Sequence, residues 1–141
     1  MEFMVIRKAD AETEAGIMPS AQLIDDMTAY NEKLVASGAM KSGAGLMSSS
    51  RGARVSFSGG KPTVVDGPFV EAKELIAGYS IIEANSLAEV IEMVKDWPQS
   101  DGHGNAQIEI RQVVTADDLG FNEEQKARYD RLVEQEKQQQ Q

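Results

Sequence analysis

The stretch Val64-Val65-Asp66-Gly67-Pro68-Phe69-Val70-Glu71-Ala72-Lys73-Glu74 joins the end of an apolar strand to a rigid turn and a cluster of charges. Asp66 can hydrogen-bond to the backbone that follows it, glycine permits positive φ, and proline fixes its own φ at about −65°. Because Gly67 precedes a proline, it should be extended or in a turn rather than helical. The stretch therefore predicts a strand that ends at Asp66 and a rigid loop directly after it.

A hairpin is predicted immediately before this loop. Apolar and polar residues alternate over Arg54–Ser58, which is the two-residue period of a strand. Gly59-Gly60 is a hairpin turn signal, and Lys61–Val65 returns as the partner strand. The preceding segment, Ala39–Ala53, is rich in glycine and serine but lacks the P-loop pattern, so we expect a long, partly mobile loop there.

The N-terminal third predicts a strand, a loop and a helix. Phe3–Lys8 has apolar residues on both faces, which is typical of a strand in the centre of a sheet. Ala9–Met18 is polar and is expected to be a connecting loop. Pro19–Ser37 predicts a helix with Ser20 as its N-cap. Its apolar stripe comprises Leu23, Met27, Tyr30 and Leu34. Tyr30 either belongs to the core or turns its hydroxyl towards a pocket.

A second strand and helix follow the charged loop. Gly78–Ala84 alternates like a strand, and Ser86-Leu87-Ala88-Glu89 has the pattern of a capping box that opens a helix. The helix is expected to run to about Trp97, because Pro98 ends it. Its buried stripe is predicted to be Leu87, Val90, Ile91 and Val94.

The C-terminal part predicts one more strand and a charged helix. Gln107–Thr115 alternates between apolar and polar residues, and Asn122 is a suitable N-cap for a helix that runs to about Lys137. We therefore divide the chain into an α+β domain at residues 1–120 and a helical tail at residues 121–141.

The order β-α-β-β-α-β, with an extra short strand near the hairpin, predicts an α+β fold of the ferredoxin-like type. Two helices cover one face of an antiparallel sheet and leave the other face apolar. The residues expected there are Met4 or Phe3, Val55 or Phe57, and Ile108 or Ile110. An apolar face of that size needs a cover, so we predict a homodimer, sheet against sheet, that closes an α+β barrel. The final helix either crosses the partner subunit or projects into solvent.

Composition restricts the possible partners. The 141-residue chain has 14 Lys and Arg against 23 Asp and Glu, a net charge of −9, and no cysteine. This balance argues against nucleic acid and against an anionic membrane surface as partners. The apolar run Phe3–Ile6 is too short for a signal peptide or a membrane span. We expect a soluble cytoplasmic protein without a metal or cofactor.

The charged loop supplies the candidates for chemistry. Asp66 and Glu71 are predicted as acid–base groups, with Arg54, Lys73 or Arg111 placed to hold a substrate carboxylate or enolate. The predicted ligand-binding set is Arg54, Phe69, Lys73, Glu74, Arg111 and Tyr30. The structural alternatives are that Asp66 caps its turn and that Arg111 pairs with a nearby glutamate. The single histidine, His103, lies between two glycines and is expected on an exposed loop.

The string Asp66–Glu74, followed by Gly78-Tyr79, resembles the DGPF branch of the YCII-related proteins. Ala44-Gly45-Leu46, Gly52-Ala53-Arg54-Val55 and Ile108–Val113 extend the resemblance over about residues 1–120. It implies a dimeric α+β barrel and a small bacterial cytoplasmic protein whose biochemical role is largely unassigned. It also implies an association of some relatives with sigma factors of the extracytoplasmic-function type.

A separate branch of that family includes a dehydrochlorinase for which a His–Asp pair is proposed as catalytic. The histidine of that pair lies early in the first helix, where this chain has Ser20, Ala21 and Gln22. Asp66 could match the acidic member, but His103 lies in a different loop. The resemblance therefore does not transfer this mechanism to the chain.

Three functions remain open from the sequence. The first is a dimeric small-molecule binder, with regulation as one option for its role and with its pocket near the Asp66–Glu74 loop. The second is a cofactor-free enzyme that uses Asp66 or Glu71 for proton transfer or elimination on a small cyclic or carbonyl compound. The third is a protein that docks a partner such as a sigma factor.

Overall fold

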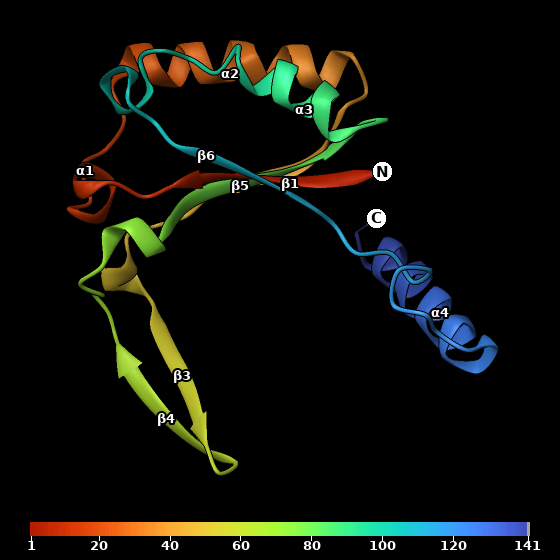
Figure 1. The fold of residues 1–141 in the computed structure, drawn as a ribbon. Coiled ribbons are helices and arrows are strands. Elements are labelled where there is room, and N and C mark those ends of the chain that lie inside the picture. Colours follow the sequence, from red (N-terminus) through yellow and green to blue (C-terminus); the bar gives the residue numbers. More distant parts are fainter. Residues whose placement is uncertain (141) are drawn as a thin grey trace.

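The chain folds as an α+β domain with a four-stranded antiparallel sheet, two helices on one face of it, a separate hairpin and a C-terminal helix (Figure 1). This computed structural model describes residues 1–140. Its strands are β1 (Glu2–Lys8), β2 (Met40–Gly45), β3 (Ala53–Ser58), β4 (Lys61–Asp66), β5 (Ile76–Glu83) and β6 (Ile108–Gln112). Its α-helices are α1 (Ala11–Glu14), α2 (Ala21–Ala36), α3 (Leu87–Val94) and α4 (Glu123–Gln139).

The sheet has the strand order β2-β5-β1-β6. Strand β1 pairs with β5 on one side and with β6 on the other, so the prediction of a central N-terminal strand is confirmed. Helix α2 follows β1 and helix α3 follows β5, and both lie on the same face of the sheet (Figure 1). The α+β, ferredoxin-like prediction is therefore confirmed.

The second strand of the sheet is β2, and here the sequence prediction is wrong. The segment expected to be a loop at Ala39–Ala53 contains Met40–Gly45, which pairs along the outer edge of β5. Its glycines and serine carry no strand signal, because strand propensity mostly reflects packing of large side chains. Gly43 approaches β5 so closely that a Cβ there would lie 3.1 Å from the carbonyl oxygen of Tyr79.

Strands β3 and β4 form the predicted hairpin, but they lie outside the main sheet as a two-stranded unit of their own. Val55 lies opposite Val64 and Phe57 lies opposite Pro62, so one face of the hairpin is apolar. The other face is largely polar and includes Ser56. The prediction that Val55 or Phe57 lies on the open face of the sheet is therefore wrong.

The core lies between the sheet and its two helices. Phe3 and Val5 of β1 point towards the helices and are almost fully buried, and Val90 of α3 is fully buried against them. Ile108 and Ile110 pack onto this cluster, so they too lie on the covered face rather than the open one. Met4 and the other alternate side chains of β1 face away from the helices.

Helix α3 is shorter and more exposed than its apolar stripe predicts. It ends at Val94 rather than near Trp97. Leu87 is 49% exposed and Ile91 is 40% exposed, although both were expected in the buried stripe. Helix α3 contacts the core through Val90, which is fully buried. The flanking positions Leu87 and Ile91 lie at the edge of that contact and stay partly exposed.

The predicted N-caps are confirmed for all three long helices. The side chains of Ser20, Ser86 and Asn122 accept hydrogen bonds from the backbone N–H groups at the start of α2, α3 and α4. Each cap satisfies a donor that a helix start leaves unpaired. At α3 the second half of the box is altered, because the Glu89 carboxylate accepts from the N–H of Asn85.

Two helices lie outside the main layers. Helix α1 forms a single turn within the predicted loop at Ala9–Met18, with Asp10 as its N-cap. Helix α4 and the hairpin extend on the side of the sheet opposite α2 and α3 (Figure 1). Within residues 1–140, no helix combines the length and hydrophobicity that crossing a membrane requires.

Candidate functional site

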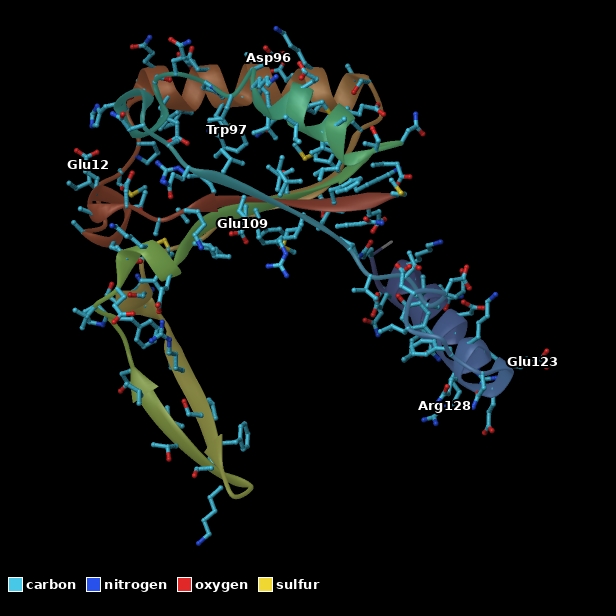
Figure 2. The ribbon with its side chains drawn as sticks, viewed as in Figure 1. Glu12, Asp96, Trp97, Glu109, Glu123 and Arg128 are labelled. Carbon is cyan, nitrogen blue, oxygen red and sulfur yellow. The ribbon has the colours of Figure 1, made fainter. Side chains whose placement is uncertain are left out.

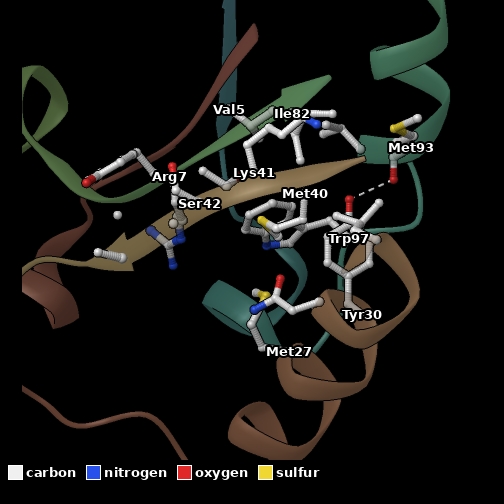
Figure 3. A pocket seen from close by; sticks show the side chains of 18 of the residues that line it. Val5, Arg7, Met27, Tyr30, Met40, Lys41, Ser42, Ile82, Met93 and Trp97 are labelled. Carbon is white, nitrogen blue, oxygen red and sulfur yellow. Dashed lines mark hydrogen bonds between the residues drawn. The ribbon is translucent and has the colours of Figure 1, made fainter. Parts of the chain in front are cut away.

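A cavity of about 770 Å³ lies between helices α2 and α3 and the strands β2 and β5. Its walls include Tyr30 and Leu34 of α2, Met93 of α3 and Trp97 just beyond it, and they are mainly apolar (Figure 3). On the sheet side it is lined by the edge strand β2, whose residues from Ser42 to Gly45 all have small side chains or none. These small residues leave space under α2, which is the physical reason that the cavity exists.

Tyr30 is the one predicted ligand-binding residue that lines this cavity. Its hydroxyl donates a 2.8 Å hydrogen bond to the carbonyl oxygen of Met93, and its ring lies 5.5 Å from the ring of Trp97. Burial, together with the nearby charge of Asp96, raises the pKa of Tyr30 to about 12. Tyr30 is therefore a core residue, which is the first alternative; its ring borders the cavity, whereas its hydroxyl is bonded to Met93.

A buried ion pair borders the cavity at the end of β1. Arg7 Nε and Nη2 donate to the two carboxylate oxygens of Asp101 at 3.0 and 2.8 Å. Nη2 also donates to Asp10, and Nη1 donates to the carbonyl oxygen of Lys8. Trp97 Nε1 donates a 2.9 Å hydrogen bond to Asp101, which therefore joins the end of β1 to the segment after α3.

The charge state of this network follows from its contacts. Burial disfavours the ionised form of Asp101, but hydrogen bonds from Arg7 and Trp97 and the charge of Arg7 outweigh it and lower its pKa. The hydrogen bonds that Arg7 donates to Asp101 raise the pKa of Arg7. Both groups are thus charged at neutral pH. Sequence reasoning missed this pair, although Arg7 shares the inward period-two face of β1 with Phe3 and Val5, and that was an available signal.

The loop after β4 is held by contacts to earlier parts of the chain. The Gly67 N–H donates to the carbonyl oxygen of Gly52, and the Phe69 N–H donates to Ser49 Oγ. Ser49 in turn binds the carboxylate of Glu14 through both its N–H and its hydroxyl. These bonds give the charged loop of the sequence a defined position against α1 and the start of β3.

Two predicted ligand-binding residues meet in this loop. The guanidinium of Arg54 lies 4.0 Å from the centre of the Phe69 ring, a cation–π distance. Asp66, Glu71, Lys73 and Glu74 are exposed, and no residue from 66 to 74 lines the 770 Å³ cavity. The prediction of a pocket near this loop thus remains untested, while the cavity that the structure describes lies elsewhere.

Arg111 lies neither at the cavity nor in the loop after β4. It is exposed on β6, and its Nη1 is 3.6 Å from Glu109 Oε2, which matches the structural alternative predicted for it. Figure 2 shows Glu109 on the side of the sheet away from the helices, and Trp97 between the helices and the sheet. His103 is exposed, as predicted, and its Nε2 lies 3.0 Å from a carboxylate oxygen of Glu12. Within residues 1–140, His, Asp and Glu side chains do not gather in threes that could hold a metal ion.

A family model of the YCII-related domain matches residues 1–127 of the chain. The chain belongs to the YCII-related family. This confirms the resemblance drawn from Asp66–Glu74 and its neighbouring motifs. Ser20, one of the residues that this chain has at the start of its first long helix, caps helix α2.

Two known proteins are similar to this YCII-related chain. An uncharacterised protein of Rhizobium meliloti (strain 1021), R00369, is 32% identical over 75 residues. The match covers 53% of this chain and 60% of that protein's length. Among solved structures, 5-chloro-2-hydroxyhydroquinone dehydrochlorinase (TftG) from Burkholderia phenoliruptrix AC1100, in complex with 2,5-dihydroxybenzoquinone, is 20% identical. The comparison covers 83% of this chain and 97% of that one, with a TM-score of 0.45.

The lining of the cavity suits an organic molecule. Apolar walls and two aromatic rings can enclose an organic molecule, and the polar groups of Tyr30 and Trp97 are already committed to Met93 and Asp101. The two carboxylates predicted for acid–base work, Asp66 and Glu71, are not among the residues that line it.

Proposed function

We propose that this YCII-related protein is a homodimeric small-molecule binder and that the ligand occupies the cavity beneath helix α2. The observation that carries this proposal is the cavity of about 770 Å³ with a mainly apolar lining. Sites for small molecules and cofactors have volumes of roughly 300–1,000 Å³, apolar walls and few polar groups.

The only tryptophan of the chain makes the proposal directly testable. Trp97 lines the cavity, so a ligand that enters should change its fluorescence. The experiment is a titration of the purified protein with a panel of small aromatic and alicyclic compounds, excited at a wavelength that selects tryptophan. Saturable quenching or enhancement by at least one chemical class is the expected result.

A cavity-filling variant shows whether such a signal comes from this site. Ser80 of β5 lines the cavity and pairs with inward-facing Val5, so Ser80→Phe should fill part of the space and weaken binding at least tenfold. Ser56→Phe, on the polar face of the hairpin, is the matched control and should bind like wild type. Unchanged binding in a folded Ser80→Phe protein would show that the binding site lies outside the cavity.

The same titration addresses the Asp66–Glu74 loop. If the ligand lies there, Phe69→Ala should abolish binding through loss of the ring beside Arg54, whereas Ser80→Phe should have no effect. The acid–base alternative is checked with Asp66→Asn and Glu71→Gln on any compound that is converted rather than only bound. Turnover that either variant abolishes would favour the enzyme over the binder.

The dimer is part of the proposal because, within residues 1–140, helices α2 and α3 cover only one face of the sheet (Figure 1). Met4 and Ile6 lie on that face, and the apolar face of the hairpin extends on the same side (Figure 1). A second copy is the occupant that these apolar surfaces favour, since two copies can cover both faces at once. Docking of a sigma factor stays a prediction from the family resemblance.

A further inference from the structure

The charged residues that line the cavity are both cationic. Of the described residues around it, only Arg7 and Lys41 carry a charge at neutral pH, and no carboxylate is among them. The chain as a whole has a net charge of −9, with 23 acidic residues against 14 basic ones. The charges in the lining of the cavity are therefore opposite in sign to the net charge of the chain.

Only one of these cations is without an ionic partner. Arg7 is balanced by Asp101 and Asp10, with four of its five N–H groups donating to described acceptors. Lys41 forms none of the ion pairs found within residues 1–140. Its ammonium group is thus free to bind an anion, and the remaining Nη1 hydrogen of Arg7 is a second donor.

The backbone of β2 is irregular at Lys41. Met40 pairs with Ile82 and Ser42 pairs with Ile81, so Lys41 is an extra residue between two consecutive partners on β5. A bulge of this kind changes the direction of a side chain relative to a regular strand. Lys41 is among the residues that line the cavity, as is Arg7.

The cavity also has a direction. Figure 3 shows Arg7 and Ser42 at one end and Tyr30 and Met93 at the other, with Met40 and Lys41 between them. The hydroxyl of Tyr30 is occupied by the Met93 carbonyl, so this end presents mainly ring and thioether surface to a ligand. One end suits a polar or charged head, and the other suits an apolar body.

We propose that the ligand is a small organic acid with an apolar, preferably aromatic, body, whose anionic group is bound by Lys41 with support from Arg7. This inference rests on the proposed function, because it names the chemical class that the same cavity accepts. A compact carboxylate can accept from an ammonium group and from a guanidinium group at once. The aromatic body would pack against Trp97 and Tyr30.

A matched pair of probes tests the charge requirement. 3-Phenylpropanoate and 3-phenylpropanamide have the same body and differ in charge, and neither absorbs where Trp97 is excited. We expect the acid to bind about tenfold more tightly than the amide, because a hydrogen bond to a charged group is worth more than a neutral one. The advantage of the acid should shrink as salt is added, whereas binding of the amide should not change.

The variant Lys41→Gln assigns that advantage to a residue. It keeps a polar side chain of similar size and removes the charge, so binding of the acid should fall to the level of the amide while the amide binds as before. Lys61→Gln, at the tip of the hairpin and outside the cavity, is the control and should change neither. Arg7 is not a suitable target, because replacing it would leave Asp101 buried without its partner.

The outcomes separate this inference from the proposed function. If the acid and the amide bind equally well, or if Lys41→Gln preserves the preference for the acid, the cavity binds small molecules but the organic-acid inference is wrong. If Lys41→Gln weakens both probes equally, Lys41 has only a structural role and the inference is again wrong. If neither probe nor any member of the wider panel affects Trp97, the proposed function itself fails.

Discussion

At the scale of single residues, Asp101 joins parts of the chain that are distant in sequence. It accepts hydrogen bonds from Arg7, 94 positions earlier, and from Trp97. It thereby holds the tryptophan that borders the cavity and the arginine at the polar end of that cavity. A buried carboxylate with three donors is a positional constraint more than a source of stability, because desolvation of both charges offsets much of their attraction.

The pH dependence of stability should reveal this residue. Because the pKa of Asp101 is lowered in the folded protein, its contribution is fully present above the unfolded value of about 4 and is lost as the pH falls below it. Asp101→Asn should therefore flatten the acid side of a plot of unfolding free energy against pH.

At neutral pH, Asp101→Ala should cost about 3–5 kcal/mol, because it leaves Arg7 buried beside only the half-buried Asp10. Urea unfolding at a series of pH values measures both effects. Asp130→Asn, on the exposed part of α4, is the control, and its free energy of unfolding should match that of the wild type throughout the series. If the free energy of unfolding of Asp101→Asn falls towards low pH as steeply as that of the wild type, the assignment of the pH dependence to Asp101 is wrong.

At the scale of elements, helix α3 shows how far a periodic pattern can be trusted. Val90 and Ile91 both belong to the predicted apolar stripe, but Val90 is fully buried and Ile91 is 40% exposed. The period of the helix defines an apolar side about 100° wide, and the partner surface decides which part of that side is covered.

Two truncations on α3 measure the difference. Val90→Ala should lower the free energy of unfolding by about 2–3 kcal/mol, since it removes buried methyl groups and leaves a cavity. Ile91→Ala removes more atoms but should cost less than about 1 kcal/mol. Chemical denaturation of the two variants side by side provides the comparison, and equal losses would mean that α3 is rotated relative to the structure described.

The loop after β4 depends on one close backbone approach. A Cβ at Gly67 would lie 1.7 Å from the carbonyl oxygen of Ser49, whereas a Cβ at Gly52 would lie 3.6 Å from that same oxygen. Gly67→Ala should displace the loop and break the stack of Arg54 on Phe69, and Gly52→Ala should be tolerated far better.

Limited proteolysis and thermal unfolding test this pair of alanine variants. We expect Gly67→Ala to be cleaved faster within residues 66–74 and to unfold at a lower temperature than Gly52→Ala. Two variants with equal resistance would show that the loop can move away from Ser49 without a penalty.

At the scale of the whole molecule, the hairpin is the element that most needs a partner. An isolated two-stranded hairpin is only marginally stable in water, and Phe57 on its apolar face is 71% exposed in the single chain. Helix α4 extends from the same side of the sheet and carries Tyr129 and Leu132 exposed (Figure 1). Figure 2 shows its charged Glu123 and Arg128 projecting away from the rest of the chain.

The mass of the particle in solution tests the proposed dimer. Sedimentation at micromolar concentration should give twice the mass of the chain. Phe57→Glu, on the apolar face of the hairpin, should shift the equilibrium towards single chains, whereas Ser56→Glu, on the polar face one position away, should not. A wild-type protein that sediments as a single chain would remove the basis for the dimer.

The sequence determined those features that depend on neighbouring residues. The N-caps at Ser20, Ser86 and Asn122, the turn at Gly59-Gly60 and the inward–outward alternation of β1 follow from local hydrogen bonding and from the period of the backbone. The family resemblance carried by Asp66–Glu74 is likewise local, and the α+β order of elements follows from these signals taken together.

Tertiary contacts decided the rest. Met40–Gly45 becomes a strand because β5 offers an edge, although its small residues carry no strand pattern. Those same small residues leave the cavity open, and the contact of Arg7 with Asp101 brings together groups from the two ends of the domain. A packing void and an ion pair between distant residues arise only when separate elements meet, so no local pattern in the chain could have specified them.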